Sequence, residues 1–92
     1  MAKKYKDYFT VLNDKGLHMR PSTEIVRCTS QFQAEVRLTY QDMTVDGKSL
    51  LGVLVLGANR GAKVCVEAEG RGAKKVVAAL LELAKKQFNI KY

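Results

Sequence analysis

The chain has only one histidine, one proline and two cysteines among its 92 residues, and it contains no long apolar run. Structural zinc sites require four nitrogen or sulfur ligands, and the two cysteines form no C-x-x-C pair, so we expect no metal. We expect Cys28 and Cys65 to stay reduced and to pack as small hydrophobic groups. A helix that spans a bilayer needs roughly 20 apolar residues. No stretch approaches that length, so we expect no membrane insertion.

The composition is that of an ordinary folded protein, with 47% hydrophobic and 27% charged residues. A chain of this length can bury a modest core without a metal or a disulfide, so we expect residues 1–92 to form a single domain. The first residues, through Asp7, are charged and lack the apolar segment of a signal peptide. We therefore expect a cytoplasmic protein.

Positive charge predominates, because 16 lysines and arginines outnumber 9 aspartates and glutamates to give a net charge of +7. Such a balance favours acidic partners, whether a protein surface, a nucleic acid or a membrane surface. The basic residues are scattered along the chain and form no run of about five or six. The charge alone therefore does not select the partner.

Four strands are predicted from segments rich in β-branched, aromatic or alternating apolar residues. The segment 35–40 alternates between polar and apolar residues, and the turn Gln41-Asp42 would join it to a short partner strand in a hairpin. The predicted strands are residues 8–12, 35–40, 43–45 and 64–69.

Three helices are predicted, over residues 21–31, 50–56 and about 72–88. Pro21 favours the first turn of the first helix. The apolar run 50–56 is compatible with a buried strand or a short helix, and Ser49 as an N-cap with Gly57 as a stop favours the helix. In the last helix the apolar residues recur with the helical period, at Ala73, Val76, Val77, Leu80, Leu81, Ala84 and Phe88.

The predicted order is strand, helix, strand, strand, helix, strand, helix. Strands with one apolar face pair naturally with helices on that face, which predicts an α+β sandwich of two layers with a largely antiparallel sheet. This order alone is equally compatible with a ferredoxin-like fold.

The only histidine and the only proline lie together in the segment G-L-H-M-R-P-S at residues 16–22. Because Pro21 predicts the start of a helix, His18 and Arg20 would lie just before it, where free N–H groups and a partial positive charge suit phosphate. Neutral imidazole is a competent nucleophile near pH 7, and a guanidinium can make bidentate contacts to phosphate oxygens. We interpret His18 as a nucleophile that carries a phosphoryl group. The alternative is that His18 only caps the helix or is exposed in a loop.

The segment G-L-H-x-R-P-S resembles the active-site signature of HPr, the histidine-containing phosphocarrier family of the bacterial phosphoenolpyruvate:sugar phosphotransferase system. The segment K-S-L-L-G-V-L at residues 48–54 resembles the regulatory serine segment of that family, and A-E-G at 68–70 also matches. The resemblance runs from about Tyr8 to Phe88. It implies an HPr-like open-faced sandwich, with a four-stranded antiparallel sheet in the order 1-4-2-3 and three helices on one face.

By this resemblance, His18 would accept a phosphoryl group on Nδ1 from enzyme I and pass it to enzyme IIA domains, while Arg20 stabilises the phosphohistidine. The protein would be a monomeric carrier, a stoichiometric substrate of its partner enzymes rather than an enzyme, and no cofactor is implied.

The resemblance also implies an apolar docking patch with a basic rim, which suits partners that have an acidic rim. The patch would contain Leu50, Leu51 and Leu54, and the rim Arg20, Arg27 and Lys48. The alternative for these leucines is core packing, and we expect some to be buried and others presented.

The resemblance further implies that Ser49 is a site of regulatory phosphorylation by a serine kinase, reversed by a phosphorylase and read by a transcriptional regulator. A phosphate there adds roughly −1.5 to −2 charges, which would repel acidic partners. As a helix N-cap, Ser49 would contribute ~1 kcal/mol without any other role.

Two features depart from the family pattern. Met19 stands beside the histidine where relatives usually have a small residue, and the last helix begins with Arg71, Lys74 and Lys75 where relatives tend to be acidic. Two rival functions remain: an HPr-like regulatory paralogue without sugar transport, and a small basic nucleic-acid-binding domain. The latter expects a continuous basic stripe with exposed aromatic residues, which the scattered charges disfavour, so we expect no nucleic-acid partner.

Overall fold

The computed structural model describes residues 3–92, so Met1 and Ala2 of the charged N-terminal stretch lie outside the described residues. The strands are β1 (Lys4–Thr10), β2 (Glu35–Tyr40), β3 (Met43–Asp46) and β4 (Lys63–Glu69). The helices are α1 (Met19–Thr29), α2 (Leu50–Leu56) and α3 (Ala73–Lys85), followed by a short 3-10 turn, η1 (Gln87–Asn89).

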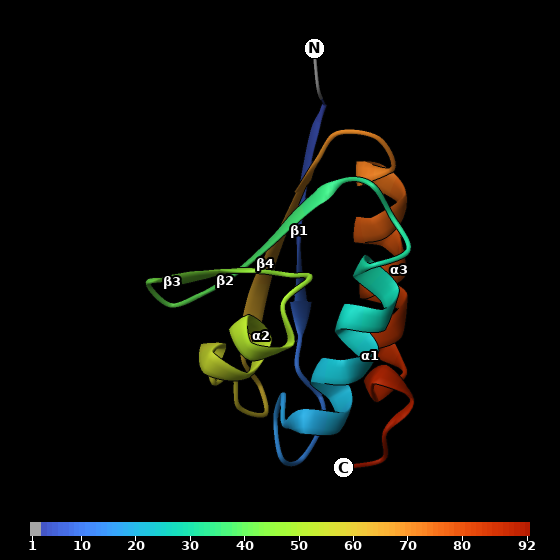
Figure 1. The fold of residues 1–92 in the computed structure, drawn as a ribbon. Coiled ribbons are helices and arrows are strands. Elements are labelled where there is room, and N and C mark those ends of the chain that lie inside the picture. The colour runs from blue at the N-terminus through green and yellow to red at the C-terminus, as the bar shows by residue number, and fades with distance from the viewer. Residues whose placement is uncertain (1–2) are drawn as a thin grey trace.

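The strands form one antiparallel sheet in the order β1-β4-β2-β3, and the helices cover one face of it (Figure 1). This is the order that the resemblance implied, and it decides between the two folds that the order of elements left open. Along β4, Val64, Val66 and Ala68 are buried beneath the helices, while the residues between them lie on the open face. The open-faced sandwich is therefore confirmed.

Several element boundaries differ from those predicted. The first strand begins at Lys4 rather than Tyr8 and ends at Thr10, because it pairs with β4 from Lys4 opposite Glu69 to Thr10 opposite Lys63. Its first residues are polar because much of this strand is exposed. The first helix ends at Thr29 rather than near Gln31.

The short helix α2 is confirmed, together with both of its predicted ends. Ser49 is its N-cap, and Gly57 ends it in the left-handed conformation with φ of 65°. Val53 and Leu56 are its buried residues, so the helix turns one side toward the core.

The last helix is shorter than predicted, because α3 ends at Lys85 and Phe88 belongs to η1. Phe88 is nevertheless fully buried, with its ring edge-to-face against Phe9 at a centroid distance of 5.7 Å. Gln87, Phe88 and Asn89 all have positive φ, which turns the chain sharply after α3. Figure 1 shows the result: the chain runs back to end beside the N-terminus of α1.

Candidate functional site

The loop that leads into α1 depends on Gly16, whose φ of +67° lies in the left-handed region. The next residue, Leu17, donates its N–H to the carbonyl oxygen of Ala58 at 2.9 Å. A Cβ at Gly16 would lie 2.9 Å from the Cα of Asn59 and closer still to the Ala58 oxygen. Gly16 therefore lets the loop lie against residues 58–59, which directs the chain into α1.

His18 is the N-cap of α1, with φ of −73° and ψ of −171°, and its side chain caps no N–H group that the structure describes. The helix begins at Met19, so the predicted start at Pro21 was wrong and Arg20 lies inside the helix rather than before it. Proline is tolerated there because the N–H groups of the first turn have no partner within the helix.

Ser22 fixes the backbone on both sides of the histidine. It is fully buried, its N–H donates to the His18 carbonyl oxygen at 3.1 Å, and its hydroxyl donates to the Leu17 carbonyl oxygen at 2.9 Å. The sequence analysis gave Ser22 no role of its own. The signal available in the sequence was the position of this serine in the first turn of a predicted helix.

The first turn of α1 is electropositive. It contains no acidic residue, and the N–H groups of Met19 and Arg20 occupy positions that have no partner within a helix. These groups and the aligned peptide dipoles amount to a partial positive charge at the helix N-terminus. An anion bound at His18 would therefore meet favourable potential before any side chain contributes.

Tyr92 lies over His18, a contact that the sequence analysis missed. The two ring centroids are 5.4 Å apart and the ring planes differ by 19°. The main-chain oxygen of Tyr92 lies 3.0 Å from Nε2 of His18. Because that oxygen can only accept a hydrogen bond, Nε2 carries the proton of the neutral ring, and the lone pair is on Nδ1. This arrangement makes Nδ1 the nucleophilic nitrogen.

Two basic side chains meet at the same tyrosine. Arg20 donates from Nη1 to the Tyr92 hydroxyl, and its guanidinium carbon lies 5.6 Å from the centroid of the ring. Nζ of Lys15 lies 5.2 Å from that centroid. His18 and Arg20, which the sequence predicted to act together, thus converge on Tyr92, and Lys15 is an additional cation that was not predicted.

The chain before Tyr92 is held by Asn13, a buried residue of the loop after β1. Its Nδ2 donates to the carbonyl oxygens of Gln87 and Ile90, each at 2.9 Å. The side chain of Gln87 donates in turn to the Leu12 carbonyl oxygen at 3.2 Å. These bonds tie the C-terminal turn to the loop that leads to His18.

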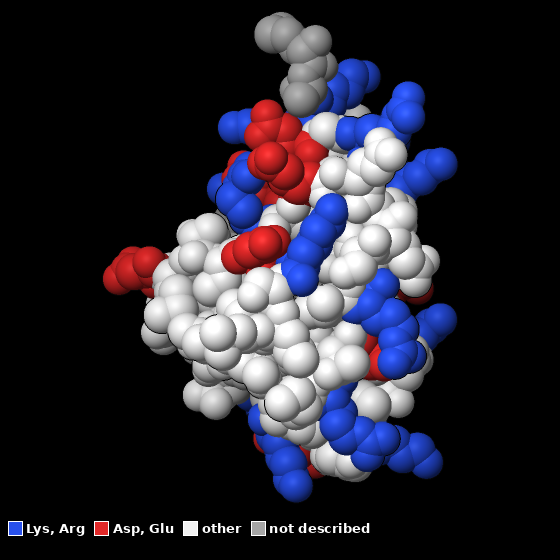
Figure 2. Space-filling view, in the orientation of Figure 1, with Lys and Arg blue, Asp and Glu red and all other residues white. Residues whose placement is uncertain are grey.

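The helix α2 presents part of its apolar surface to solvent. Leu51 and Val55 are 71% and 55% exposed, Leu50 and Leu54 are half-buried, and Val53 is buried. Figure 2 shows a broad surface over α2 without lysine, arginine, aspartate or glutamate, bordered by acidic side chains toward the β2–β3 hairpin and by basic side chains below and beside it. The predicted leucines are thus split as expected, and Val55 is an exposed neighbour that the sequence analysis missed.

Comparison with known proteins decides the family. Residues 5–86 match the model of PTS-HPr, described as the PTS HPr component phosphorylation site. The chain belongs to this family. HPr proteins are phosphocarriers of the phosphotransferase system, so a phosphocarrier role of the HPr type follows from the match.

Solved HPr structures share the fold. HPr-C-His from Thermoanaerobacter tengcongensis is 27% identical, with a TM-score of 0.90, and the match covers 96% of this chain and 99% of that chain. The phosphocarrier protein HPr from Bacillus anthracis str. Ames is 25% identical, with a TM-score of 0.81 and coverage of 86% and 94%. An HPr dimer from Thermoanaerobacter tengcongensis is 31% identical, with a TM-score of 0.74 and coverage of 85% and 90%.

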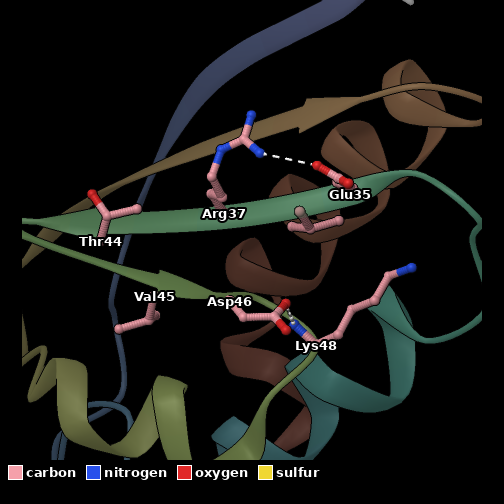
Figure 3. A pocket seen from close by; sticks show the side chains of 7 residues that line it. Glu35, Arg37, Thr44, Val45, Asp46 and Lys48 are labelled. Atoms are coloured by element: carbon pink, nitrogen blue, oxygen red, sulfur yellow. Dashed lines mark hydrogen bonds and ion pairs between the residues drawn. The ribbon is translucent and has the colours of Figure 1, made fainter.

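Arg27 and Lys48 lie in different surroundings. They are the other two cations that the HPr resemblance placed around the docking patch. The side chain of Arg27 is 69% exposed and pairs with Glu24 at 3.4 Å. Lys48 is half-buried, and its Nζ donates to the Phe32 carbonyl oxygen at 2.6 Å. Figure 3 shows the Lys48 side chain reaching toward α1 at the edge of a hollow of about 460 Å³, lined by residues of 35–37 and 44–48. Lys48 thus uses one of its donors within the fold.

The basic start of α3 belongs to a different part of the HPr fold. Arg71, Lys74 and Lys75 are exposed around its first turn, where they line an open hollow with Lys3. Figure 1 shows that this turn lies at the opposite end of the molecule from the N-terminus of α1. These cations are therefore not part of the surroundings of His18.

Within residues 3–92, no helix combines the length and apolar character needed to cross a membrane. Over the same described range, no three His, Cys, Asp or Glu side chains are grouped so as to hold a metal ion.

Proposed function

We propose that this HPr-family protein accepts a phosphoryl group on Nδ1 of His18 from phospho-enzyme I and passes it to enzyme IIA domains of sugar phosphotransferase systems. The observation that carries the proposal is the position of His18 as the N-cap of α1, with Nε2 hydrogen-bonded to the main-chain oxygen of Tyr92. That bond leaves the Nδ1 lone pair free beside a helix N-terminus, where N–H groups and the Arg20 guanidinium favour an anion.

In the transfer, the Nδ1 lone pair of neutral His18 forms a bond to phosphorus. The bond between phosphorus and its donor atom on enzyme I breaks, and its electron pair stays on that donor atom. Nε2 keeps its proton, so the phosphorylated ring carries a positive charge next to the negative phosphoryl group. Phosphoryl transfer depends mainly on positioning and charge stabilisation, which the helix N-terminus and Arg20 supply. Delivery to an IIA domain reverses these bond changes, and the carrier is regenerated.

The proposed docking surface for both partners is the exposed apolar face of α2 with the basic residues beside it. Leu51 and Val55 are the side chains with the most area to bury there. Arg20 and Arg27 lie on α1, which packs against α2, and both are exposed. An apolar centre with a cationic margin fits a partner that has an acidic margin, because charge speeds the encounter and apolar contact holds the complex.

Ser49 is proposed as a second, regulatory phosphorylation site, used by a serine kinase and a phosphorylase. It precedes Leu50 and Leu51, so a phosphate there would place negative charge at the edge of the docking face. Acidic partners would be repelled without unfolding of the domain, and a transcriptional regulator could read the modified form.

The experiment that tests the carrier function is incubation with phosphoenolpyruvate and catalytic enzyme I. We expect one acid-labile, alkali-stable phosphoryl group per chain, and none in His18→Ala. Circular dichroism of the variant checks that it is folded. Equal labelling of both proteins would exclude the carrier function.

The same reaction separates the rival functions. Transfer from the phosphorylated protein to a sugar-specific IIA domain supports transport, and failure to label any native IIA domain favours a regulatory paralogue. Salt-sensitive oligonucleotide binding without labelling would favour the nucleic-acid-binding alternative.

We also propose that the protein acts as a single domain over residues 1–92, as a monomer in the cytoplasm. The core that the described residues share, from Phe9 through Phe88, supports one domain. Because one similar HPr structure is described as a dimer, light scattering at working concentration is the check on the monomer.

A further inference from the structure

We propose that Tyr92 is a positioning residue for phosphoryl transfer, which holds His18 in the Nδ1-reactive tautomer and holds Arg20 beside it. The inference rests on the proposed function of His18. It adds a residue 74 positions away in the sequence, outside both motifs that pointed to the site.

Tyr92 contacts the His18 ring away from its reactive Nδ1 edge. Tyr92 covers one face of the imidazole by stacking and occupies the Nε2 edge with its main-chain oxygen. The Nδ1 lone pair lies in the ring plane, at a different edge, so a phosphorus atom approaches it without displacing the tyrosine ring. Tyr92 therefore restricts the rotation of His18 without itself occupying the Nδ1 edge.

The hydrogen bond to the main-chain oxygen of Tyr92 also responds to the charge that the reaction creates. When Nδ1 bonds to phosphorus, the ring becomes cationic, and its Nε2–H becomes a stronger donor. The hydrogen bond to Tyr92, 3.0 Å long in the free protein, is then worth more in the transition state than in the ground state. Interactions of that kind raise the rate of the chemical step rather than only the affinity.

The side chain of Tyr92 acts on Arg20. An arginine on the surface loses much conformational freedom when it takes up one position over a phosphoryl group. The Tyr92 hydroxyl already accepts a hydrogen bond from Nη1 of Arg20, and the guanidinium lies near the ring. Since a guanidinium has five N–H donors, Arg20 can keep this bond and still contact phosphoryl oxygens. Part of the entropy cost of ordering Arg20 is thus met before the phosphoryl donor binds.

Three anchors hold the tyrosine in place. The N–H of Lys15 donates to the main-chain oxygen of Tyr92 at 3.2 Å, and Nζ of Lys15 lies over the ring. Asn13 holds Ile90 two residues earlier, and Phe88 is fully buried in the core. The chain end is therefore fastened on both sides of the loop that presents His18.

The test compares Tyr92→Phe, Tyr92→Ala and deletion of Tyr92 with a matched control, Tyr8→Ala. Tyr8 is also exposed and has Nζ of Lys63 at 5.3 Å from its ring centroid, but it lies on the sheet, on β1. Phosphorylation is measured with enzyme I and, separately, with phosphoramidate, a small donor that loses ammonia as its P–N bond breaks. Nitrogen-15 NMR of the unphosphorylated protein reports the His18 tautomer.

We expect Tyr92→Phe, which loses only the bond to Arg20, to slow transfer about threefold. Tyr92→Ala and the deletion should slow it about tenfold or more with both donors, at an unchanged KM for enzyme I. Only the deletion removes the main-chain oxygen of Tyr92, and it should turn a single Nε2–H tautomer into a mixture. Tyr8→Ala should match the unmodified protein in every measurement.

Unchanged rates in all three Tyr92 variants would overturn the proposal, as would an unchanged tautomer in the deletion. A loss confined to enzyme I and to its KM would overturn it as well, because Tyr92 would then be a docking residue. If the unmodified protein takes no phosphoryl group on His18 from either donor, the proposed function fails instead, and the NMR result still shows whether Tyr92 orders the ring.

Discussion

The side-chain oxygen of Ser49 accepts a hydrogen bond from the N–H of Gly52 at 3.0 Å, so the residue proposed for regulation is also the structural cap of α2. We predict that Ser49→Ala lowers the free energy of unfolding by about 1 kcal/mol and leaves phosphoryl transfer nearly unchanged. Ser49→Asp keeps a capping oxygen and should retain stability, but its charge should slow transfer to acidic partners.

Urea denaturation and transfer kinetics measure the two effects separately. Ser30→Ala, at the exposed C-cap of α1, is the control and should change neither. If Ser49→Asp transfers as fast as the unmodified protein, negative charge at this position does not regulate docking.

Gly16 has a left-handed backbone conformation and also lies close to residues 58–59, whereas Gly61 has the left-handed conformation without a close neighbour. Both have positive φ, +67° and +86°, but a Cβ at Gly61 would have no heavy atom within 4 Å. Each substitution by alanine should cost about 1–3 kcal/mol of stability for the backbone conformation. Gly16→Ala should cost more, because the loop must also move away from Ala58. Thermal denaturation measures the stability that each variant loses. Equal losses in the two variants would show that the close contact between Gly16 and Ala58 contributes nothing to stability.

Burial raises the pKa of the Cys28 thiol. In the unfolded chain a thiol ionises near pH ~8.5, so above that pH the unfolded state loses its proton first and the free energy of unfolding falls as pH rises. Below it, both states are protonated and the thiol contributes no pH dependence. We predict that stability falls more steeply between about pH 8.5 and 10 in the unmodified protein than in Cys28→Ala. Parallel denaturation curves over that range would contradict this.

Leu51 has the largest exposed fraction among the large hydrophobic side chains described as exposed, at 71%. Leu51→Ala should therefore cost the fold little. If α2 is the docking face, Leu51→Ala should raise the KM for enzyme I and for an IIA domain about five- to tenfold. That change corresponds to the loss of ~1–1.5 kcal/mol of binding free energy from the apolar surface that the leucine buries at the interface. Leu12→Ala, another exposed leucine beside α3, serves as the control. An equal KM for both variants would place the docking face elsewhere.

Features with a local periodic signal were predictable from the sequence. In α3, Val76, Val77 and Leu80 follow the helical period and are buried. In β2, Val36 and Leu38 alternate with exposed or half-buried residues, and the hairpin to β3 forms as expected. Periodicity works here because each element buries one face only.

Features fixed by tertiary contact were not predictable. Pro21 indicates a helix start only to within its first turn, so the helix begins at Met19 instead. Phe88 has the spacing of a helical residue but lies in a turn of positive φ, because filling the core beside Phe9 outweighs the backbone preference. No local pattern announces that turn, and so none places Tyr92 against His18.

The most direct measurement is phosphorus-31 and nitrogen-15 NMR of the protein after phosphorylation by phosphoenolpyruvate and enzyme I. We predict one phosphoryl group per chain, with phosphorus coupled to Nδ1 of His18 and the signal lost in acid. Coupling to Nε2, a phosphate on any other side chain, or no phosphorylation at all would contradict a carrier that works through Nδ1 of His18.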